Sequence, residues 1–152
     1  MTIQARYVHT NIIAQDWQRL ANFYEQVLGC VPKPPPRDLA GDWLEAATGV
    51  HSAHLKGIHL ILPGLGVDAP TLEIYQYVDG IEKPPTMVNR PGLAHIAFVV
   101  PDVASALEAV IAGGGGAVGE VVSTDIPDVG RITFVYATDP EGNIIELQHW
   151  ER

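Results

Sequence analysis

The stretch HTNIIAQDWQRLANFYEQVLG, residues 9–29, returns later in the chain as HIAFVVPDVASALEAVIAGGG, residues 95–115. In each copy a β-branched and apolar run precedes an aspartate, which is a preferred helix N-cap, and an apolar stripe at helical spacing follows it. Glycine, a common helix stop, ends both copies. The matched positions are His9, Asp16 and Gly29 in the first copy and His95, Asp102 and Gly115 in the second. The repeat predicts a strand followed by a helix, used twice.

Each copy is followed by two strand-like runs that close its half of the chain. GIHLILP (57–63) and TLEIYQY (71–77) close the first half, and RITFVYA (131–137) and NIIELQHW (143–150) close the second. Their β-branched and aromatic content, bounded by glycines and prolines, is typical of paired strands. The first half also carries VPKPPPRD (31–38), whose prolines lack amide donors, so we expect an extended connection there.

These patterns predict an α+β fold of two tandem β-α-β-β-β modules within a single domain, residues 1–152. Module one spans about residues 5–80, a linker about 81–91, and module two about 92–152. The first half is the longer one. Its surplus falls around residues 38–56, where a cap over a substrate can be built.

Composition narrows the classes of partner. The chain is 47% hydrophobic and 18% charged, as in ordinary globular proteins, and its net charge of −9 disfavours nucleic acid and anionic membranes. It has neither a run of about 18 apolar residues nor a leader-like N-terminus, so we expect a cytoplasmic protein without a membrane partner. Cys30 is the only cysteine, which excludes an intrachain disulfide.

Four residues stand out as candidate metal ligands. Each half pairs a histidine in its first strand with a glutamate in its last, His9 with Glu73 and His95 with Glu146. A carboxylate inside an apolar strand is costly unless it is paired, hydrogen-bonded or metal-bound. A single strand histidine is more often a hydrogen-bonded core residue, and such glutamates can pair with surface lysines, but the matched positions favour ligands.

Strand alternation places the four candidates on one face of their strands. The opposite, apolar positions suit packing beneath the two helices; they include Leu72, Ile74, Ile145 and Leu147. Two imidazoles and two carboxylates suit a divalent ion, and zinc, nickel, cobalt, manganese and iron(II) all accept such donors. An ion so held leaves room for substrate oxygens and makes a proton next to a carbonyl easier to remove.

The chain resembles the vicinal oxygen chelate superfamily, which includes glyoxalases, bleomycin-resistance proteins and extradiol dioxygenases. The resemblance is carried by four segments: HTNIIAQDWQRLANFYEQVLG, LEIYQY, GLAHIAFVVPDVASALEAVIAGGG and FVYATDPEGNIIELQ. It implies paired modules whose mixed sheet curls around a metal cavity. The family's ligand positions fall on His9, Glu73, His95 and Glu146. The quartet is similar to that of metal-dependent glyoxalase I, which implies Glu146 as the first choice of catalytic base and Glu73 as the second.

Other positions depart from these relatives. Glyoxalase I usually has an arginine four residues after the first ligand and an asparagine four after the second, both for glutathione; here they are Ile13 and Tyr77. Methylmalonyl-CoA epimerases generally have glutamine at the position of Glu73, and extradiol dioxygenases have a non-ligand there. The resemblance therefore implies a metal-dependent lyase or isomerase acting on a small oxygenated molecule and not specific for glutathione.

The alternative is a small-molecule binding protein of the bleomycin-resistance type, or an epimerase-like or dioxygenase-like relative. Relatives commonly dimerise, and open sheet edges favour a partner copy, so we expect a homodimer. The substrate, the metal and the sharing of the site between chains stay open, as do the roles of His51, His54 and His59. His149 lies on the face opposite Glu146 and is expected to be structural.

Overall fold

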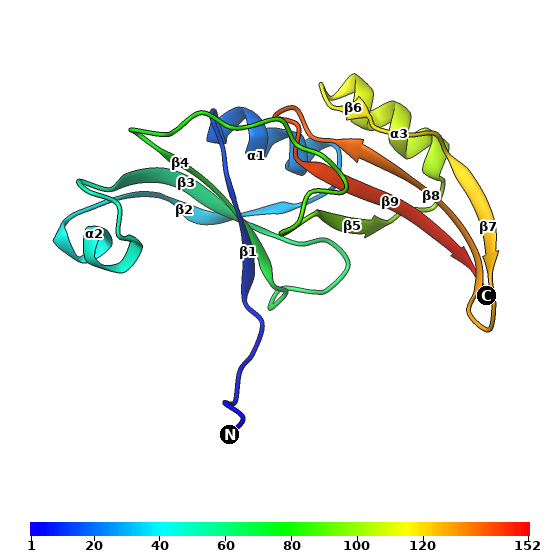
Figure 1. The fold of residues 1–152 in the computed structure, drawn as a ribbon, viewed down its shortest axis with the longest axis horizontal. Coiled ribbons are helices and arrows are strands. Elements are labelled where there is room, and N and C mark those ends of the chain that lie inside the picture. Colours follow the sequence, from blue (N-terminus) through cyan, green and yellow to red (C-terminus); the bar gives the residue numbers. More distant parts are fainter. The chain divides into compact units, whose positions relative to one another are not determined.

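The computed structural model describes residues 1–152 and divides into two compact units, Met1–Glu82 and Lys83–Arg152. Figure 1 shows the helices and strands of both units. The fold is α+β, as the sequence predicted, and has three helices and two mixed sheets. None of the helices has the length and apolar run needed to cross a membrane.

Unit 1 holds a four-stranded sheet in the order β1-β4-β3-β2. Strands β1 and β4 are parallel, and the other two pairings are antiparallel. This is the order expected of a β-α-β-β-β module, because the last strand returns beside the first. The elements are β1 (His9–Ile13), α1 (Trp17–Gln26), β2 (Val31–Ala40), α2 (Asp42–Thr48), β3 (His54–Ile61) and β4 (Thr71–Tyr77).

Unit 2 repeats this plan. Its sheet has the order β5-β9-β8-β6, with β7 also paired to β8, and the parallel pair is again first strand with last. The place of β2, the edge strand of unit 1 that pairs with β3, is thus taken by two shorter strands that pair with β8. The elements are β5 (His95–Val99), α3 (Val103–Ala112), β6 (Gly116–Ala117), β7 (Val122–Ile126), β8 (Gly130–Thr138) and β9 (Ile144–Glu151).

Both predicted helix starts are present. The side chain of Asp16 accepts a hydrogen bond from the Arg19 amide at 3.0 Å, and that of Asp102 accepts one from the Ser105 amide at 2.7 Å. These bonds satisfy amides that the first helical turn leaves unpaired. Helix α1 ends at Gln26, and the chain then turns through Gly29, which has a φ of 71°.

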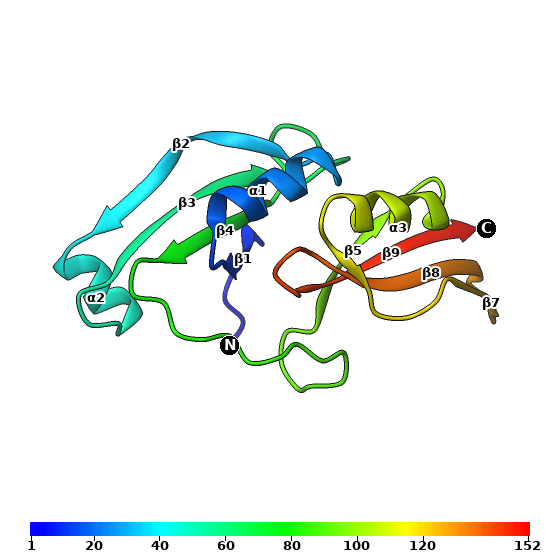
Figure 2. The same ribbon diagram turned by 90° about the horizontal axis from the view of Figure 1, so that it is seen from above.

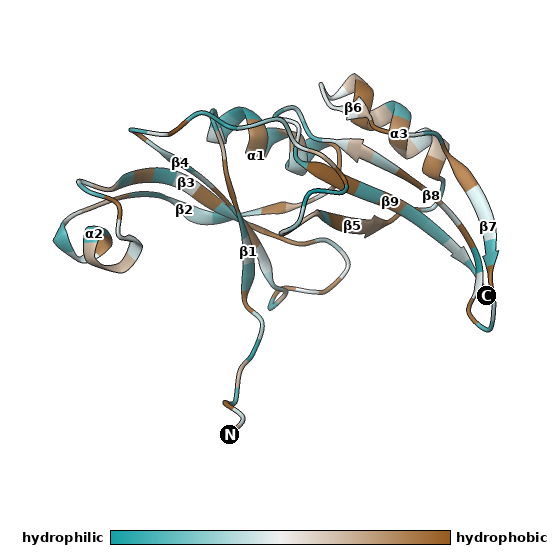
Figure 3. Cartoon of the chain, in the orientation of Figure 1, coloured by the Kyte–Doolittle hydropathy of each residue, from teal (hydrophilic) through white to brown (hydrophobic).

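Helices α1 and α3 each cover one face of their own sheet. Helix α1 packs on β3 and β4, and α3 packs on β8 and β9, as Figure 2 shows within each unit. The strand residues beneath the helices are those that alternation selected, and Figure 3 shows hydrophobic and hydrophilic residues following one another along β3. Leu72, Ile74, Ile145 and Leu147 are each at most 1% exposed. The opposite face of each sheet, which carries the candidate ligands, is left for other contacts.

The expected extended connection at residues 31–38 is an edge strand. It belongs to β2, which pairs with β3 along one side only, so prolines without an amide donor are tolerated there. The pairing shifts register between Lys33 and Arg37, where the prolines stand. Lys33 lies opposite His59, and Arg37 lies opposite Gly57.

The surplus segment at residues 38–56 contains one short helix, α2, between the end of β2 and the start of β3. Its short helix α2 buries Leu44 in a cluster with Ala53 and Leu55. Partly buried apolar residues pack against this cluster; they are Leu39, Tyr75 and Tyr77. Leu55 and Tyr77 are cross-strand partners, and each lies four residues along its strand from His59 and Glu73, respectively, on the same face. Helix α2 therefore closes one end of the face that carries Glu73.

Cys30 follows α1 and is 3% exposed. Burial, with a smaller contribution from the Glu25 charge, raises the pKa of its thiol from 9.0 to about 12. A shift of that size lowers the thiolate fraction at pH 8 about a thousandfold, so we expect iodoacetamide to label Cys30 rapidly only after unfolding. Equal labelling of native and guanidinium-unfolded protein, measured by mass spectrometry, would contradict this.

The same shift makes folding stability depend on pH. Since the pKa of the Cys30 thiol is higher in the folded than in the unfolded protein, folding stability should fall as the pH rises from about 9 toward 12.

Candidate functional site

The first candidate pair, His9 and Glu73, is brought together by the parallel pairing of β1 with β4. The register places Asn11 opposite Glu73, so His9, two residues earlier in β1, reaches Glu73 diagonally on the same face. His9 Nε2 lies 3.2 Å from Glu73 Oε2. The His9 side chain is 41% exposed, whereas that of Glu73 is only 10% exposed.

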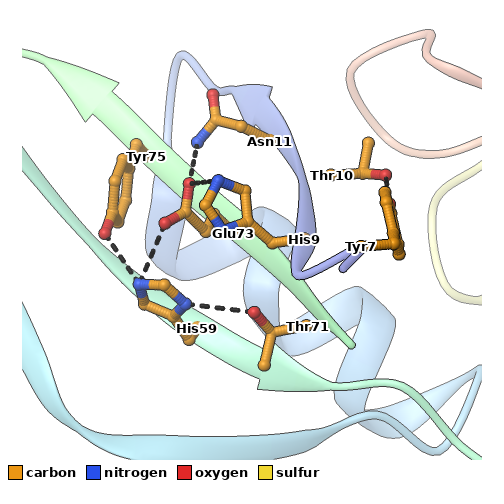
Figure 4. Close-up of polar contacts among 8 residues, drawn as sticks. All are labelled: Tyr7, His9, Thr10, Asn11, His59, Thr71, Glu73 and Tyr75. Atoms are coloured by element: carbon orange, nitrogen blue, oxygen red, sulfur yellow. Dashed lines mark hydrogen bonds and ion pairs between the residues drawn. The ribbon is translucent and has the colours of Figure 1, made fainter. Parts of the chain in front are cut away.

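Both oxygens of Glu73 have partners, as Figure 4 shows. Asn11 Nδ2 donates to Oε2 at 3.2 Å, on the side where His9 lies. His59 Nε2, from β3, lies 3.0 Å from Oε1. The carboxylate is therefore held from two sides, which compensates for the loss of water around a charge in a buried strand.

His59 is the residue that sequence reasoning left open. Besides Glu73, its Nε2 lies 2.9 Å from the Tyr75 hydroxyl, and its Nδ1 lies 3.1 Å from Thr71 Oγ1. Burial lowers the pKa of His59, and the Glu73 charge opposes that shift. Burial and the neighbouring Glu73 raise the pKa of Tyr75 to about 12. The only signal for His59 in the sequence was its place in a strand-like run next to the one that carries Glu73.

The second pair, His95 and Glu146, is built in the same way from β5 and β9. Ala97 lies opposite Glu146, and His95 again reaches the glutamate diagonally, with 3.0 Å between Nε2 and Oε2. The Tyr136 ring lies beside that of His95, with 5.0 Å between centroids. Glu146 has no further hydrogen bond to a side chain, so His95 is the only side chain that holds this carboxylate by a polar contact.

The separations in the two pairs fit metal donors. Two donors bound to one zinc ion at about 2.1 Å stand about 3.0 to 3.4 Å apart, and the two pairs have 3.2 Å and 3.0 Å. No group of three or more His, Cys, Asp or Glu side chains is arranged to hold a metal ion. In unit 1 the reason is that His9 and His59 contact different oxygens of Glu73, so the two imidazoles do not converge. Each unit by itself offers two donors.

The other histidines lie away from these pairs. His51 Nδ1 lies 3.1 Å from Glu45 Oε1, and its side chain is 90% exposed. His54 Nε2 lies 2.6 Å from Asp38 Oδ1; it is five residues before His59 in β3 and therefore on the opposite face. His149 Nδ1 lies 3.0 Å from the Val100 carbonyl, which ties β9 to the end of β5 and agrees with the structural role predicted for it.

Two cations stand on the same face as Glu73. The register of β2 places Lys33 in the row of His59 and Glu73, and Arg37 in the row of Tyr75. Both charges act on His59, lowering its pKa. No carboxylate forms an ion pair with either, although the Arg37 guanidinium donates to the Pro35 carbonyl. In a chain of net charge −9 these two unpaired cations make that face locally positive.

Comparison with known proteins shows the family of the chain. The model of the glyoxalase/bleomycin resistance protein/dioxygenase superfamily matches residues 6–147, nearly the whole chain. The chain belongs to this superfamily. The resemblance seen in the sequence is thereby confirmed, and the superfamily includes many enzymes and commonly binds divalent metals. No protein of curated function matches.

Solved structures of the superfamily share the fold. A glyoxalase family protein from Bacillus cereus is similar at a TM-score of 0.77 and 20% identity, covering 100% of this chain and 97% of its own. A glyoxylase/bleomycin resistance protein/dioxygenase domain from Frankia sp. EAN1pec has a TM-score of 0.57 and 17% identity, and the match covers 99% of this chain and 100% of that one. A glyoxalase/bleomycin resistance protein/dioxygenase family enzyme from Burkholderia phytofirmans PsJN has a TM-score of 0.56 and 14% identity, and the match covers 97% of this chain and 100% of that one. At these identities the likeness shows the fold alone.

Proposed function

We propose that this superfamily member is a divalent-metal-dependent lyase or isomerase that moves a proton on a small oxygenated substrate. One observation carries the proposal: the same diagonal histidine–glutamate pair occurs at the same register of the parallel strands in both units. A chance salt bridge has no reason to repeat in this way. His9, Glu73, His95 and Glu146 would be the four ligands, two from each unit. A divalent ion, when bound, supplies positive charge that makes a proton next to a carbonyl more acidic.

The two glutamates are suited to different roles. Glu73 is fixed by Asn11 and His59, which suits a ligand that stays in place. Glu146 has only His95 as a polar partner, so its carboxylate is the one free to turn toward a substrate and accept a proton. Glu146 is therefore the proposed base, and Glu73 the second choice.

The surroundings of Glu73 indicate the kind of substrate. Lys33 and Arg37 on the same face favour a molecule with a carboxylate or phosphate group beside its carbonyl. The apolar cluster under α2 limits its size at one end. Ile13 and Tyr77 stand where glutathione contacts are expected, and Tyr77 packs against the α2 cluster, so a glutathione adduct has little to hold it.

The test combines metal content with proton exchange. Purified protein should contain a divalent metal by elemental analysis. In deuterated water the metal-loaded protein should exchange the proton adjacent to the carbonyl of an anionic hydroxyketone faster than that of a neutral one. Glu146→Gln should abolish the exchange. The glutathione hemithioacetal of methylglyoxal should react with a kcat/KM below about 10⁴ M⁻¹s⁻¹.

Two results would overturn this proposal. Native protein without metal that regains none on dialysis against zinc, nickel, cobalt, manganese or iron(II) would remove the metal site. Metal-loaded protein that binds the hydroxyketones without exchanging any proton would instead support a binding protein of the bleomycin-resistance type.

A further inference from the structure

The two half-sites have the same ligands and different neighbours. Within β3–β4 the residue opposite Glu73 is His59, and within β8–β9 the residue opposite Glu146 is Tyr136. On the other side Glu73 faces Asn11 of β1, whereas Glu146 faces Ala97 of β5. The repeat thus provides an internal comparison, in which every polar group that touches Glu73 beyond its ligand partner is replaced around Glu146.

The hydrogen bonds around His59 have one consistent direction. An ionised carboxylate only accepts, so the hydrogen between His59 Nε2 and Glu73 Oε1 must be on Nε2. A neutral imidazole then accepts at Nδ1, and the Thr71 hydroxyl, 3.1 Å away, donates to it. The Tyr75 hydroxyl lies 2.9 Å from His59 Nε2, so with the hydrogen on that nitrogen the hydroxyl oxygen accepts from it. Thr71 therefore selects the tautomer of His59 that can hold Glu73.

Gly57 leaves room for the Tyr75 ring to lie beside His59. A Cβ atom at position 57 would stand 2.0 Å from the Ile74 carbonyl oxygen and 2.5 Å from Tyr75 Cδ1, so both the β4 backbone and the tyrosine ring need glycine there. Its cross-strand partner is Tyr75 itself. The ring is then close enough for its hydroxyl to lie 2.9 Å from His59 Nε2, with 5.8 Å between the two ring centroids. Figure 4 shows His59 between Thr71 and Tyr75, on the far side of the Glu73 carboxylate from His9.

We infer that His59 is a positioning residue, which holds Oε1 of Glu73 with the help of Thr71 and Tyr75 so that Oε2 is presented beside His9 as a fixed metal donor. The inference rests on the proposed function. Under this inference the two units have different roles: unit 1 supplies a rigid donor pair, and unit 2 supplies a glutamate that can move. Hydrogen-bonded partners of a ligating carboxylate keep it oriented, and their loss typically lowers metal affinity 10- to 100-fold.

Titration with cobalt(II), followed by its visible absorption, tests this inference. His59→Phe keeps an aromatic ring of similar size and removes the donor, so the Kd for cobalt should rise roughly 10- to 100-fold. His59→Gln offers an amide donor to the same oxygen and should recover most of the affinity. Thr71→Val, which replaces the hydroxyl that selects the tautomer by a methyl group, should give an intermediate loss.

The matched control is His54→Phe. It makes the same substitution in the same strand, next to a carboxylate, but on the opposite face. Its cobalt Kd should equal that of the original protein. Nitrogen-15 spectra of metal-free protein should also show His59 with its proton on Nε2, a readout that general destabilisation would not produce.

The outcomes separate the two proposals. If the original protein binds no cobalt, the proposed function fails and this inference fails with it. If it binds cobalt and folded His59→Phe binds it equally well, only the inference is overturned. A proton on Nδ1 of His59 in the metal-free protein would also overturn it, whether or not the variants fold. Equal losses in His54→Phe and His59→Phe would show a general effect and likewise overturn it.

Discussion

Replacing His95 by alanine should leave the purified protein with little of its divalent metal, and so should His9→Ala, Glu73→Gln and Glu146→Gln. Each change removes one of four proposed donors, so the loss in affinity should exceed the 10- to 100-fold typical of an outer hydrogen-bond partner. His149→Ala is the control, because that histidine lies on the face opposite Glu146 and hydrogen-bonds to the Val100 carbonyl. Elemental analysis after gel filtration measures the metal retained by each variant.

Thermal unfolding gives an independent readout of the same prediction. A metal present at 100 times its Kd stabilises the folded state by about 2.7 kcal/mol. For a chain of this size that corresponds to a rise in Tm of roughly 5 to 10 °C. The rise on adding metal should disappear in the four ligand variants and persist in His149→Ala. Equal metal content and equal Tm shifts in all five variants would rule out the quartet.

The sequence predicted those parts of the structure that depend on local pattern. Aspartate caps start both helices, and period-two alternation placed Leu72 and Ile145 under helices and Glu73 and Glu146 on the other face. Each of these features is set by neighbours within a few residues. The diagonal approach of each histidine to its glutamate depends on the pairing of a module's first strand with its last, which local pattern does not predict.

The sequence did not predict the role of His59, the strand β2 or the helix α2. The first two depend on strand register and on the position of a strand at the sheet edge. His59 faces Glu73 only because β3 and β4 pair in one particular register, and residues 62–70 between them are too long a loop to set it. The prolines of β2 argued against a strand, yet an edge strand tolerates residues that cannot donate on its outer side. Helix α2 has only seven residues, too short for a clear helical period.

The protein is expected to be a homodimer. In each sheet the first strand lies at an edge, β1 in unit 1 and β5 in unit 2. The last residues of these strands are apolar and exposed, Ile13 at 49% and Val99 at 73%. Open edges bordered by exposed apolar residues are seldom left uncovered, and a two-fold partner covers them at both sites. Light scattering at micromolar concentration should give twice the chain mass of 16.4 kDa; a value near the chain mass would refute the dimer.

Mixing two defective chains should then show which units complete a metal site. One chain carries His9→Ala and keeps His95 and Glu146; the other carries Glu146→Gln and keeps His9 and Glu73. If a site takes one unit from each chain, a mixed dimer holds one site with both defects and one site that is intact. Since random reassociation makes half the dimers mixed, about a quarter of the original metal binding should return.

If each site lies within a single chain, every site in the mixture carries one defect, and no metal binding returns above that of the separate variants. The comparison requires that the two chains have exchanged, which a mass tag on one of them reports. Recovery to a quarter therefore assigns the site to two chains, and full exchange without recovery assigns it to one. Because either result follows from counting intact donor pairs, it is independent of which metal is bound and which substrate is used.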